Sequence, residues 1–188
     1  AFDRDPAAIA ATRDRIERAL VSIPVIERPR VDVLHAPFSE APAQLLALGI
    51  RPGEVDGLLA DLGVSSPQID RPERGFSFGS DGPLDMRMDP TSGPTAADLV
   101  MTLDRNGLRD LLRDFGDERE AGRIATWLVR RRAEASFETT SDLADVISQA
   151  KGGRRGARTH PATRSFQALR IAVNRELDEL DSMLEWGP

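Results

Sequence analysis

The stretch VDGLLADLGVSSPQ, residues 55–68, decides how the chain is expected to fold. Its first half, residues 55–61, is an apolar run that ends in the carboxylate of Asp61, which predicts a strand. Shorter runs of this kind occur at residues 1–3 and 31–34, and apolar residues at helical spacing follow each of them. Because strand and helix alternate, the sequence predicts an α/β fold in which helices cover a parallel sheet.

Two helices are expected between these strands. Asp5 followed by Pro6 is a favourable helix start, since aspartate accepts from free backbone N–H groups and proline suits the first turn. A second helix is expected from Ala41 to Leu48. Beyond Asp61, up to about Pro94, the chain is rich in Gly, Pro, Ser and Asp. A connection of that length is usually functional or disordered.

The remainder of the chain is expected to be helical. Apolar stripes predict one helix closed by Gly116, a second around Ile124 and Leu128, and a third that is capped near Thr140 or Ser141. A last, long helix has an apolar stripe that consists of Phe166, Leu169, Val173, Leu177, Leu180 and Leu184. We therefore expect a sheet part with its long loop in residues 1–94, a helical insertion in residues 95–160, and a returning helix in residues 161–188.

The composition is that of a soluble globular protein, with 188 residues of which 40% are hydrophobic and 30% charged. No apolar run approaches the roughly 20 residues that cross a bilayer, so we expect a cytoplasmic protein without membrane contact. Cysteine is absent and there are two histidines, so no metal site is expected. The net charge of -6 argues against a protein that coats nucleic acid, although basic residues gather locally after residue 145.

Two carboxylates stand at predicted strand ends, Asp3 and Asp61. Ligands of open parallel sheets bind just outside the carboxyl ends of the strands, where an acidic residue typically accepts hydrogen bonds from ribose hydroxyls. Phe38 follows the next predicted strand, where its ring could stack on an adenine. The alternatives are an aspartate in a simple turn and a phenylalanine packed in the core.

Four long motifs carry a resemblance to a known family. They are DLGVSSPQ (residues 61–68), RGFSF (74–78), DGPLDMRMD (81–89) and HPATRSFQALRIAVNRELDEL (160–180). In this order they are very similar to the RsmH (MraW) family of ribosomal RNA small-subunit cytosine-N4 methyltransferases. The similarity extends from the opening FDRDP to the C-terminal helix.

The resemblance implies a partial Rossmann-like methyltransferase sheet with a helical insertion that helps to bind RNA. It implies that Asp3, Phe38, Asp61 and Gln68 contact S-adenosyl-L-methionine, and that a cytosine of 16S ribosomal RNA in the 30S subunit is methylated at N4. The family's glycine-rich cofactor loop is expected before Ala1 and its last strands after Pro188. We therefore expect an internal fragment that is inactive or weakly active by itself.

The catalytic hydrogen-bond acceptor stays open at this point. A cytosine amine is a poor nucleophile, so the enzyme must hold it in line with the methyl group and accept hydrogen bonds from its protons. Asp61 is the first candidate, followed by Ser65, Ser66 and Asp85, while the serines can equally cap a turn. The target base must also leave its stack, which suits a long loop such as residues 70–90.

A basic segment is expected to contact RNA. It comprises Lys151, Arg154, Arg155, Arg158, His160 and Arg164, at the start of the last helix. Backbone N–H groups at a helix start and arginines on a loop both suit phosphate. The alternative is a solvated loop, with Arg164 paired to an acidic residue of the sheet domain. Two other functions are compatible with the sequence, namely a noncatalytic RNA-binding or assembly module and an NAD-dependent oxidoreductase fragment.

Overall fold

The chain divides into two compact units. A computed structural model describes residues 1–153 and 159–187. The sheet unit comprises Ala1–Leu62 and Leu177–Pro188, and the helical unit comprises Gly63–Glu176. Among the described residues, no helix is both long and apolar enough to cross a membrane.

The sheet unit contains a short parallel sheet with helices, as expected for an α/β fold. Strand β1 (Phe2–Asp3) pairs in parallel with β2 (Leu34–His35), with Asp3 opposite His35. Helix α1 (Pro6–Leu20) connects them, and the short helix η1 (Val25–Glu27) follows it. The expected start of α1 is confirmed, because Asp5 caps the helix by accepting from the Ala7 N–H at 2.9 Å.

Three further elements complete the sheet unit. Helices η2 (Phe38–Glu40) and α2 (Ala41–Ala47) follow β2, and α9 (Glu176–Trp186) returns from the far end of the chain. The indole Nε1 of Trp186 donates to the Phe38 carbonyl at 3.1 Å, and the Glu179 carboxylate accepts from the Ser39 N–H at 2.9 Å. These hydrogen bonds fix α9 to the segment that follows β2.

The predicted strand at residues 55–61 is not formed. These residues have no regular secondary structure and pair with no described strand, and Leu59 is 97% exposed. A strand exists only through hydrogen bonds to a neighbour, whereas the apolar pattern reports only that the side chains favour burial. The pattern therefore identified an apolar segment correctly but could not supply a pairing partner.

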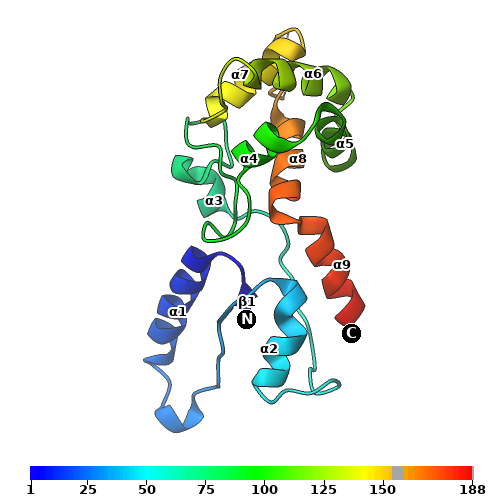
Figure 1. Ribbon diagram of the computed structural model, residues 1–188. Helices are drawn as coiled ribbons and strands as arrows, with labels where there is room; N and C mark the ends of the chain where they lie inside the picture. Colours follow the sequence, from blue (N-terminus) through cyan, green and yellow to red (C-terminus); the bar gives the residue numbers. More distant parts are fainter. Residues whose placement is uncertain (154–158, 188) are drawn as a thin grey trace. The chain divides into compact units, whose positions relative to one another are not determined.

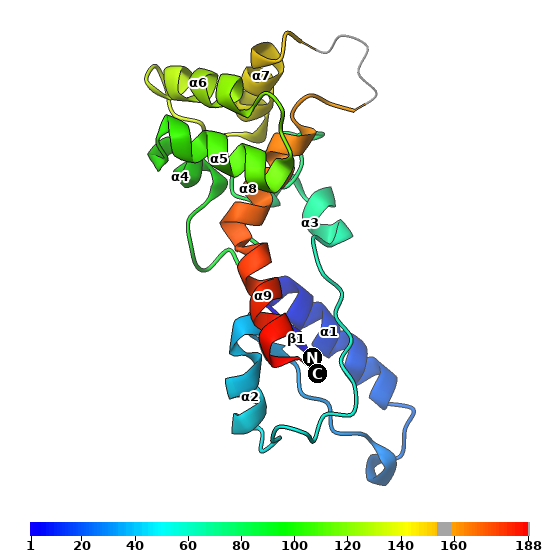
Figure 2. The same ribbon diagram turned by 90° about the vertical axis from the view of Figure 1, so that its right-hand side faces the viewer.

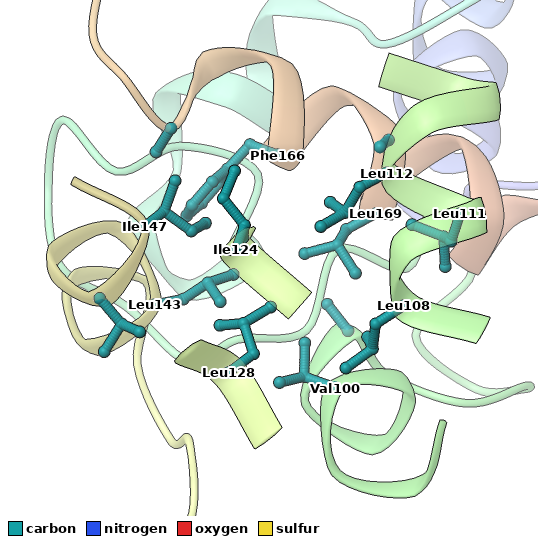
Figure 3. Close-up of a cluster of buried hydrophobic side chains, with 14 of the residues drawn as sticks. Val100, Leu108, Leu111, Leu112, Ile124, Leu128, Leu143, Ile147, Phe166 and Leu169 are labelled. Carbon is teal, nitrogen blue, oxygen red and sulfur yellow. The ribbon is translucent and has the colours of Figure 1, made fainter. Parts of the chain in front are cut away.

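The helical unit is built around α8 (Thr163–Asn174), which packs most extensively against α5 (Arg105–Gly116). Helices α4 (Ala96–Thr102), α6 (Ala121–Arg132) and α7 (Thr140–Ala150) surround this pair in Figures 1 and 2. Short helices α3 (Ser66–Asp70) and η3 (Pro72–Arg74) precede them. In Figure 3 the buried side chains of five helices point toward one another, namely Val100, Leu108, Leu111, Leu112, Ile124, Leu128, Leu143, Ile147, Phe166 and Leu169.

The long loop belongs to the helical unit. Leu84 and Met86 are 2% and 0% exposed and form part of the same core as the helices. The Leu84 N–H donates to the Glu138 carbonyl at 2.9 Å, beside an isolated bridge between Pro83 and Thr139. The two compact units therefore differ from the expected segments 1–94, 95–160 and 161–188, because residues 63–94 and α8 pack with the insertion helices.

The predicted long last helix is wrong, since it is two helices. Arg175 adopts a left-handed conformation with φ 49°, and its N–H returns to the Ala172 carbonyl at 3.2 Å, which ends α8. The Arg170 guanidinium pairs with Glu176 across this turn at 2.8 Å. An apolar stripe that continues at helical spacing does not reveal a single left-handed residue.

Two helix ends also differ from expectation. Helix α7 is capped by Thr139 rather than Thr140 or Ser141, since the Thr139 hydroxyl accepts from the Asp142 N–H at 3.2 Å. Helix α5 includes Gly116, and the left-handed residue that ends it is Asp117, with φ 46°. Gly116 is instead required by close packing, because a Cβ there would lie 2.5 Å from the Arg164 carbonyl oxygen.

We expect Gly116→Ala to destabilise the helical unit by about 1–3 kcal/mol, because the added methyl forces α5 away from α8. Gly122→Ala is the matched control, since its Cβ would meet only the Arg109 side chain, at 3.9 Å. Alanine is a better helix former than glycine, so this control should be neutral or stabilise by up to about 1 kcal/mol. Equal urea midpoints for the two variants would contradict close packing at Gly116.

Candidate functional site

Asp3 and Phe38 lie at the same edge of the sheet. Asp3 ends β1 and Phe38 starts η2 just after β2, and the Ala36 N–H donates to the Asp3 carbonyl at 3.0 Å. Asp3 is exposed, and one of its carboxylate oxygens accepts a hydrogen bond from the Asp5 N–H at 2.7 Å. Phe38 is half-buried. The structure thus brings together a carboxylate and an aromatic ring near the carboxyl ends of two parallel strands.

Asp61 lies in the irregular segment at residues 55–61 of the sheet unit and is exposed. Within the described part of the chain, its carboxylate makes no hydrogen bond or ion pair. No described contact joins it to Asp3 or Phe38. Its carboxylate is therefore accessible to a ligand, although regular strand pairing does not hold it in place.

Ser65, Ser66 and Gln68 form the start of α3 in the helical unit. Ser65 is the N-cap residue, and the Gln68 Oε1 accepts from the Ser65 N–H at 2.9 Å. Gln68 is 5% exposed, whereas both serines are exposed. Ser65 therefore caps a helix start, as the alternative to a catalytic role predicted. The side-chain oxygen of Gln68 has a structural partner in this capping arrangement.

Asp85 is bound on both oxygens by Arg87. The Arg87 Nε and Nη2 lie 2.8 Å from Oδ1 and Oδ2 respectively, and the Arg87 N–H donates to Oδ1 at 3.0 Å. Burial opposes ionisation of this carboxyl group, but the hydrogen bonds and charge of Arg87 outweigh it and keep the pKa of Asp85 below its ordinary value. Asp85 is therefore a charged anchor of the loop, with little capacity to accept a further proton at neutral pH.

Sequence reasoning missed the residue that holds this loop, Asn174. Its amide is 2% exposed; Oδ1 accepts from the Met88 N–H at 2.7 Å and Nδ2 donates to the Met86 carbonyl at 2.8 Å. Arg74 adds hydrogen bonds to the carbonyls of Arg87, at 3.1 Å, and Met88, at 2.8 Å. The only signal in the sequence was an amide residue next to the apolar stripe of the last helix.

Met86 shows what this clamp achieves. It has φ 63°, a left-handed conformation that costs a residue other than glycine about 1–3 kcal/mol. Its side chain is fully buried in the core of the helical unit. The hydrogen bonds that the Asn174 and Arg74 side chains make with the backbone of residues 86–88, together with burial, offset this strain and fix the conformation of this segment.

Of the residues expected to contact RNA, Lys151 and Arg164 already have partners in the helical unit. The Lys151 ammonium lies 2.8 Å from Glu118, which is 3% exposed, and donates to the Pro161 carbonyl at 3.1 Å. The Arg164 guanidinium donates to the Asp117 carbonyl at 2.6 Å. The guanidinium also lies 3.4 Å from the Asp117 carboxylate, so the acidic residue that pairs with Arg164 belongs to the helical unit and not to the sheet domain. The expected contacts Arg154, Arg155 and Arg158 lie outside the described residues.

His160 is fixed by an aromatic contact and a capping hydrogen bond. Its ring stacks on Phe78 with centroids 4.4 Å apart, and Phe78 meets Phe166 edge-on at 4.8 Å. The His160 Nδ1 accepts from the Ala162 N–H at 3.2 Å, just before α8. The RGFSF and HPATR motifs therefore contact each other, and His160 helps to define the start of α8.

Asn174→Ala should destabilise the helical unit by about 1–3 kcal/mol for each buried backbone group left without a partner. Asn106→Ala on the exposed surface of α5 is the control, with an expected change within about 0.5 kcal/mol. Chemical denaturation measures both. Similar unfolding midpoints for the two variants would show that the loop does not depend on the amide.

Asp85→Asn should lower the free energy of unfolding at pH 7. This difference from the unmodified protein should disappear in acid. Because the folded-state pKa of Asp85 is depressed, its ionisation stabilises the fold above the ordinary aspartate pKa of about 3.9. That contribution disappears as the pH falls through the folded-state value. Denaturation at pH 7 and at about pH 3 tests the sign, with the exposed Asp145→Asn on α7 as the control. A stability difference that is independent of pH would contradict the assignment.

The chain is similar over nearly its whole length to proteins named Ribosomal RNA small subunit methyltransferase H. That of Caulobacter vibrioides is 52% identical over 184 residues, which are 98% of this chain and 54% of the relative. That of Methylibium petroleiphilum is 49% identical, covering 98% of this chain and 55% of the relative. That of Mycobacterium avium is 48% identical, covering 96% and 45%.

The chain thus spans about half the length of the curated relatives it matches. A family model described as the MraW methylase family matches residues 1–187. This match includes the sheet edge with Asp3 and Phe38, the clamped loop and α8. The chain therefore belongs to the MraW methylase family.

Proposed function

We propose that the protein containing this chain transfers a methyl group from S-adenosyl-L-methionine to N4 of a cytosine in 16S ribosomal RNA. The observation that carries this proposal is about 50% identity, across nearly the whole chain, to proteins named as small-subunit ribosomal RNA methyltransferases. Because the substrate would be ribosomal RNA, free or in the 30S subunit, the reaction would take place in the cytoplasm.

The arrangement of the sheet unit supports a Rossmann-like methyltransferase sheet. Strands β1 and β2 are parallel and α1 forms the crossover between them, which is the repeating element of such sheets. The helical unit, with its own hydrophobic core, would be the insertion into that domain.

The sheet edge suits the nucleoside part of S-adenosyl-L-methionine. Asp3 presents an exposed carboxylate that could accept hydrogen bonds from ribose hydroxyls, and the half-buried Phe38 ring could stack on adenine. Asp61 would add a second carboxylate. Gln68 is a weaker candidate, because its oxygen caps α3 and its side chain is buried.

When bound, S-adenosyl-L-methionine supplies an electrophilic methyl group. The chain would have to orient the cytosine amine toward that group and accept hydrogen bonds from its protons, so that nitrogen can share its lone pair. Among the candidates, Asp61 offers an exposed carboxylate without a described partner. Ser65 and Ser66 remain alternatives, while Asp85 would act by holding the loop through its contacts with Arg87.

In the full-length protein, Asp3→Ala and Asp61→Ala should each weaken S-adenosyl-L-methionine binding about ten-fold or more, because polar groups of the ligand lose their partners. Asp56→Ala, on the same exposed segment as Asp61, is the matched control. Calorimetric titration with S-adenosyl-L-methionine and, in parallel, with NAD measures the effect. Unchanged affinity in both variants, or preferential binding of NAD, would overturn the site assignment.

A further inference from the structure

A surface cavity of about 330 Å³ lies beside the start of α8 in the helical unit. It is lined by Glu118, Arg119, Glu120, Lys151 and Arg164. Three of these residues are cationic, and they come from the α5–α6 connection, the end of α7 and the first turn of α8. The cavity thus gathers positive charge from three segments that are distant in the sequence.

The carboxylates at this cavity are already balanced by cations. Glu118 is 3% exposed and pairs with Lys151 at 2.8 Å. Glu120 pairs with Arg123, which does not line the cavity, at 3.3 Å. Among the described residues, the Arg119 side chain has neither an ion pair nor a hydrogen bond, and it is exposed. The lining therefore has a surplus positive charge, which Arg119 supplies.

Arg164 can exchange its ion pair with Asp117 for contacts with a ligand. Its Nη1 donates to the Asp117 carbonyl at 2.6 Å and lies 3.4 Å from the Asp117 carboxylate. The side chains of Arg164 and Asp117 are 46% and 89% exposed, and the other N–H groups of the guanidinium can bind a ligand while the hydrogen bond to the carbonyl is kept. Exposed pairs of this kind contribute little free energy, because water screens both charges. A phosphate offers a guanidinium stronger, bidentate hydrogen bonds. Arg164 could therefore turn from Asp117 to a phosphate at low cost.

Lys151 has a different role at the cavity. Its side chain is 18% exposed and that of Glu118 is 2% exposed, so separating the two would leave a buried carboxylate uncompensated. The Lys151 ammonium also donates to the Pro161 carbonyl at 3.1 Å, next to the start of α8. Lys151 therefore supports the wall of the cavity and neutralises Glu118.

We propose that this cavity binds a backbone phosphate of the RNA substrate, with Arg119 and Arg164 as its ligands. The inference rests on the proposed function, from which it takes RNA as the substrate. It adds Arg119 to the RNA-contacting residues and assigns Lys151 to support rather than to contact. Binding replaces the exposed ion pair between Arg164 and the Asp117 carboxylate and neutralises the unpaired charge of Arg119.

The test uses the full-length protein, a 16S ribosomal RNA fragment and 30S subunits, with binding measured over a range of salt concentrations. Arg119→Gln and Arg164→Gln should each weaken binding about ten-fold. Each should also reduce the logarithmic salt dependence by about 0.7–0.9. Arg130→Gln on the exposed end of α6 is the matched control, and it should change neither quantity. Thermal unfolding and S-adenosyl-L-methionine affinity verify that each variant is folded.

Asp117→Asn should change the affinity for RNA in the opposite direction. Asparagine tolerates the left-handed conformation of residue 117, so the fold should be retained. Because the competing carboxylate is removed while Arg164 remains, binding should strengthen by up to about five-fold. Weaker binding by this variant would contradict the exchange of partners at Arg164.

The outcomes separate the two proposals. If the unmodified protein neither binds nor methylates the RNA, the proposed function fails and the phosphate site fails with it. If the unmodified protein is active but the Arg119 and Arg164 variants match Arg130→Gln in affinity and salt dependence, the phosphate site alone is wrong. If these variants lose affinity for 30S subunits but not for the RNA fragment, the cavity contacts a ribosomal protein, which also overturns the proposal.

Discussion

The hydrogen bonds between the Asn174 amide and the backbone of Met86 and Met88 are the interaction on which the helical unit depends. They join two segments more than 80 residues apart in sequence, at 2.7 and 2.8 Å, in a site where water cannot replace them. A loop fixed in this way can contribute Leu84 and Met86 to the core. The clamp therefore converts a long connection, which composition alone marks as irregular, into a structural part of the unit.

Charged side chains of this unit also bind polar groups that the fold would otherwise leave without a partner. Arg132 donates to the carbonyls of Val100 and Leu103 at the end of α4, at 2.7 and 2.5 Å, and Lys151 neutralises the buried Glu118. Buried polar groups without partners are costly, so each of these cations is committed to the fold. A count of basic residues in the sequence therefore overestimates the charge that remains for a ligand.

The sequence was sufficient for features that depend on local patterns. Helix periodicity predicted most helices, and the Asp5-Pro6 start was confirmed. The sequence was insufficient where the outcome depends on contacts between distant residues. Residues 55–61 have the pattern of a strand but no described partner, and Arg175 interrupts a stripe that continues on both sides. The Asn174 clamp was missed for the same reason, since nothing in its neighbours indicates the loop it binds.

The candidate site illustrates the difference between motif and geometry. The resemblance implied cofactor contacts for Asp3, Asp61 and Gln68, and Asp85 was a later candidate for the catalytic hydrogen-bond acceptor. The structure separates them by the state of their side chains: Asp85 is bound on both oxygens and Gln68 caps a helix, whereas Asp3 and Asp61 are exposed. A ligand gains most from polar groups that the fold has left accessible. Chemistry directed at a cofactor or an amine is therefore better sought at the two exposed carboxylates, and the occupied groups are better understood as the support that holds the surrounding loops in place.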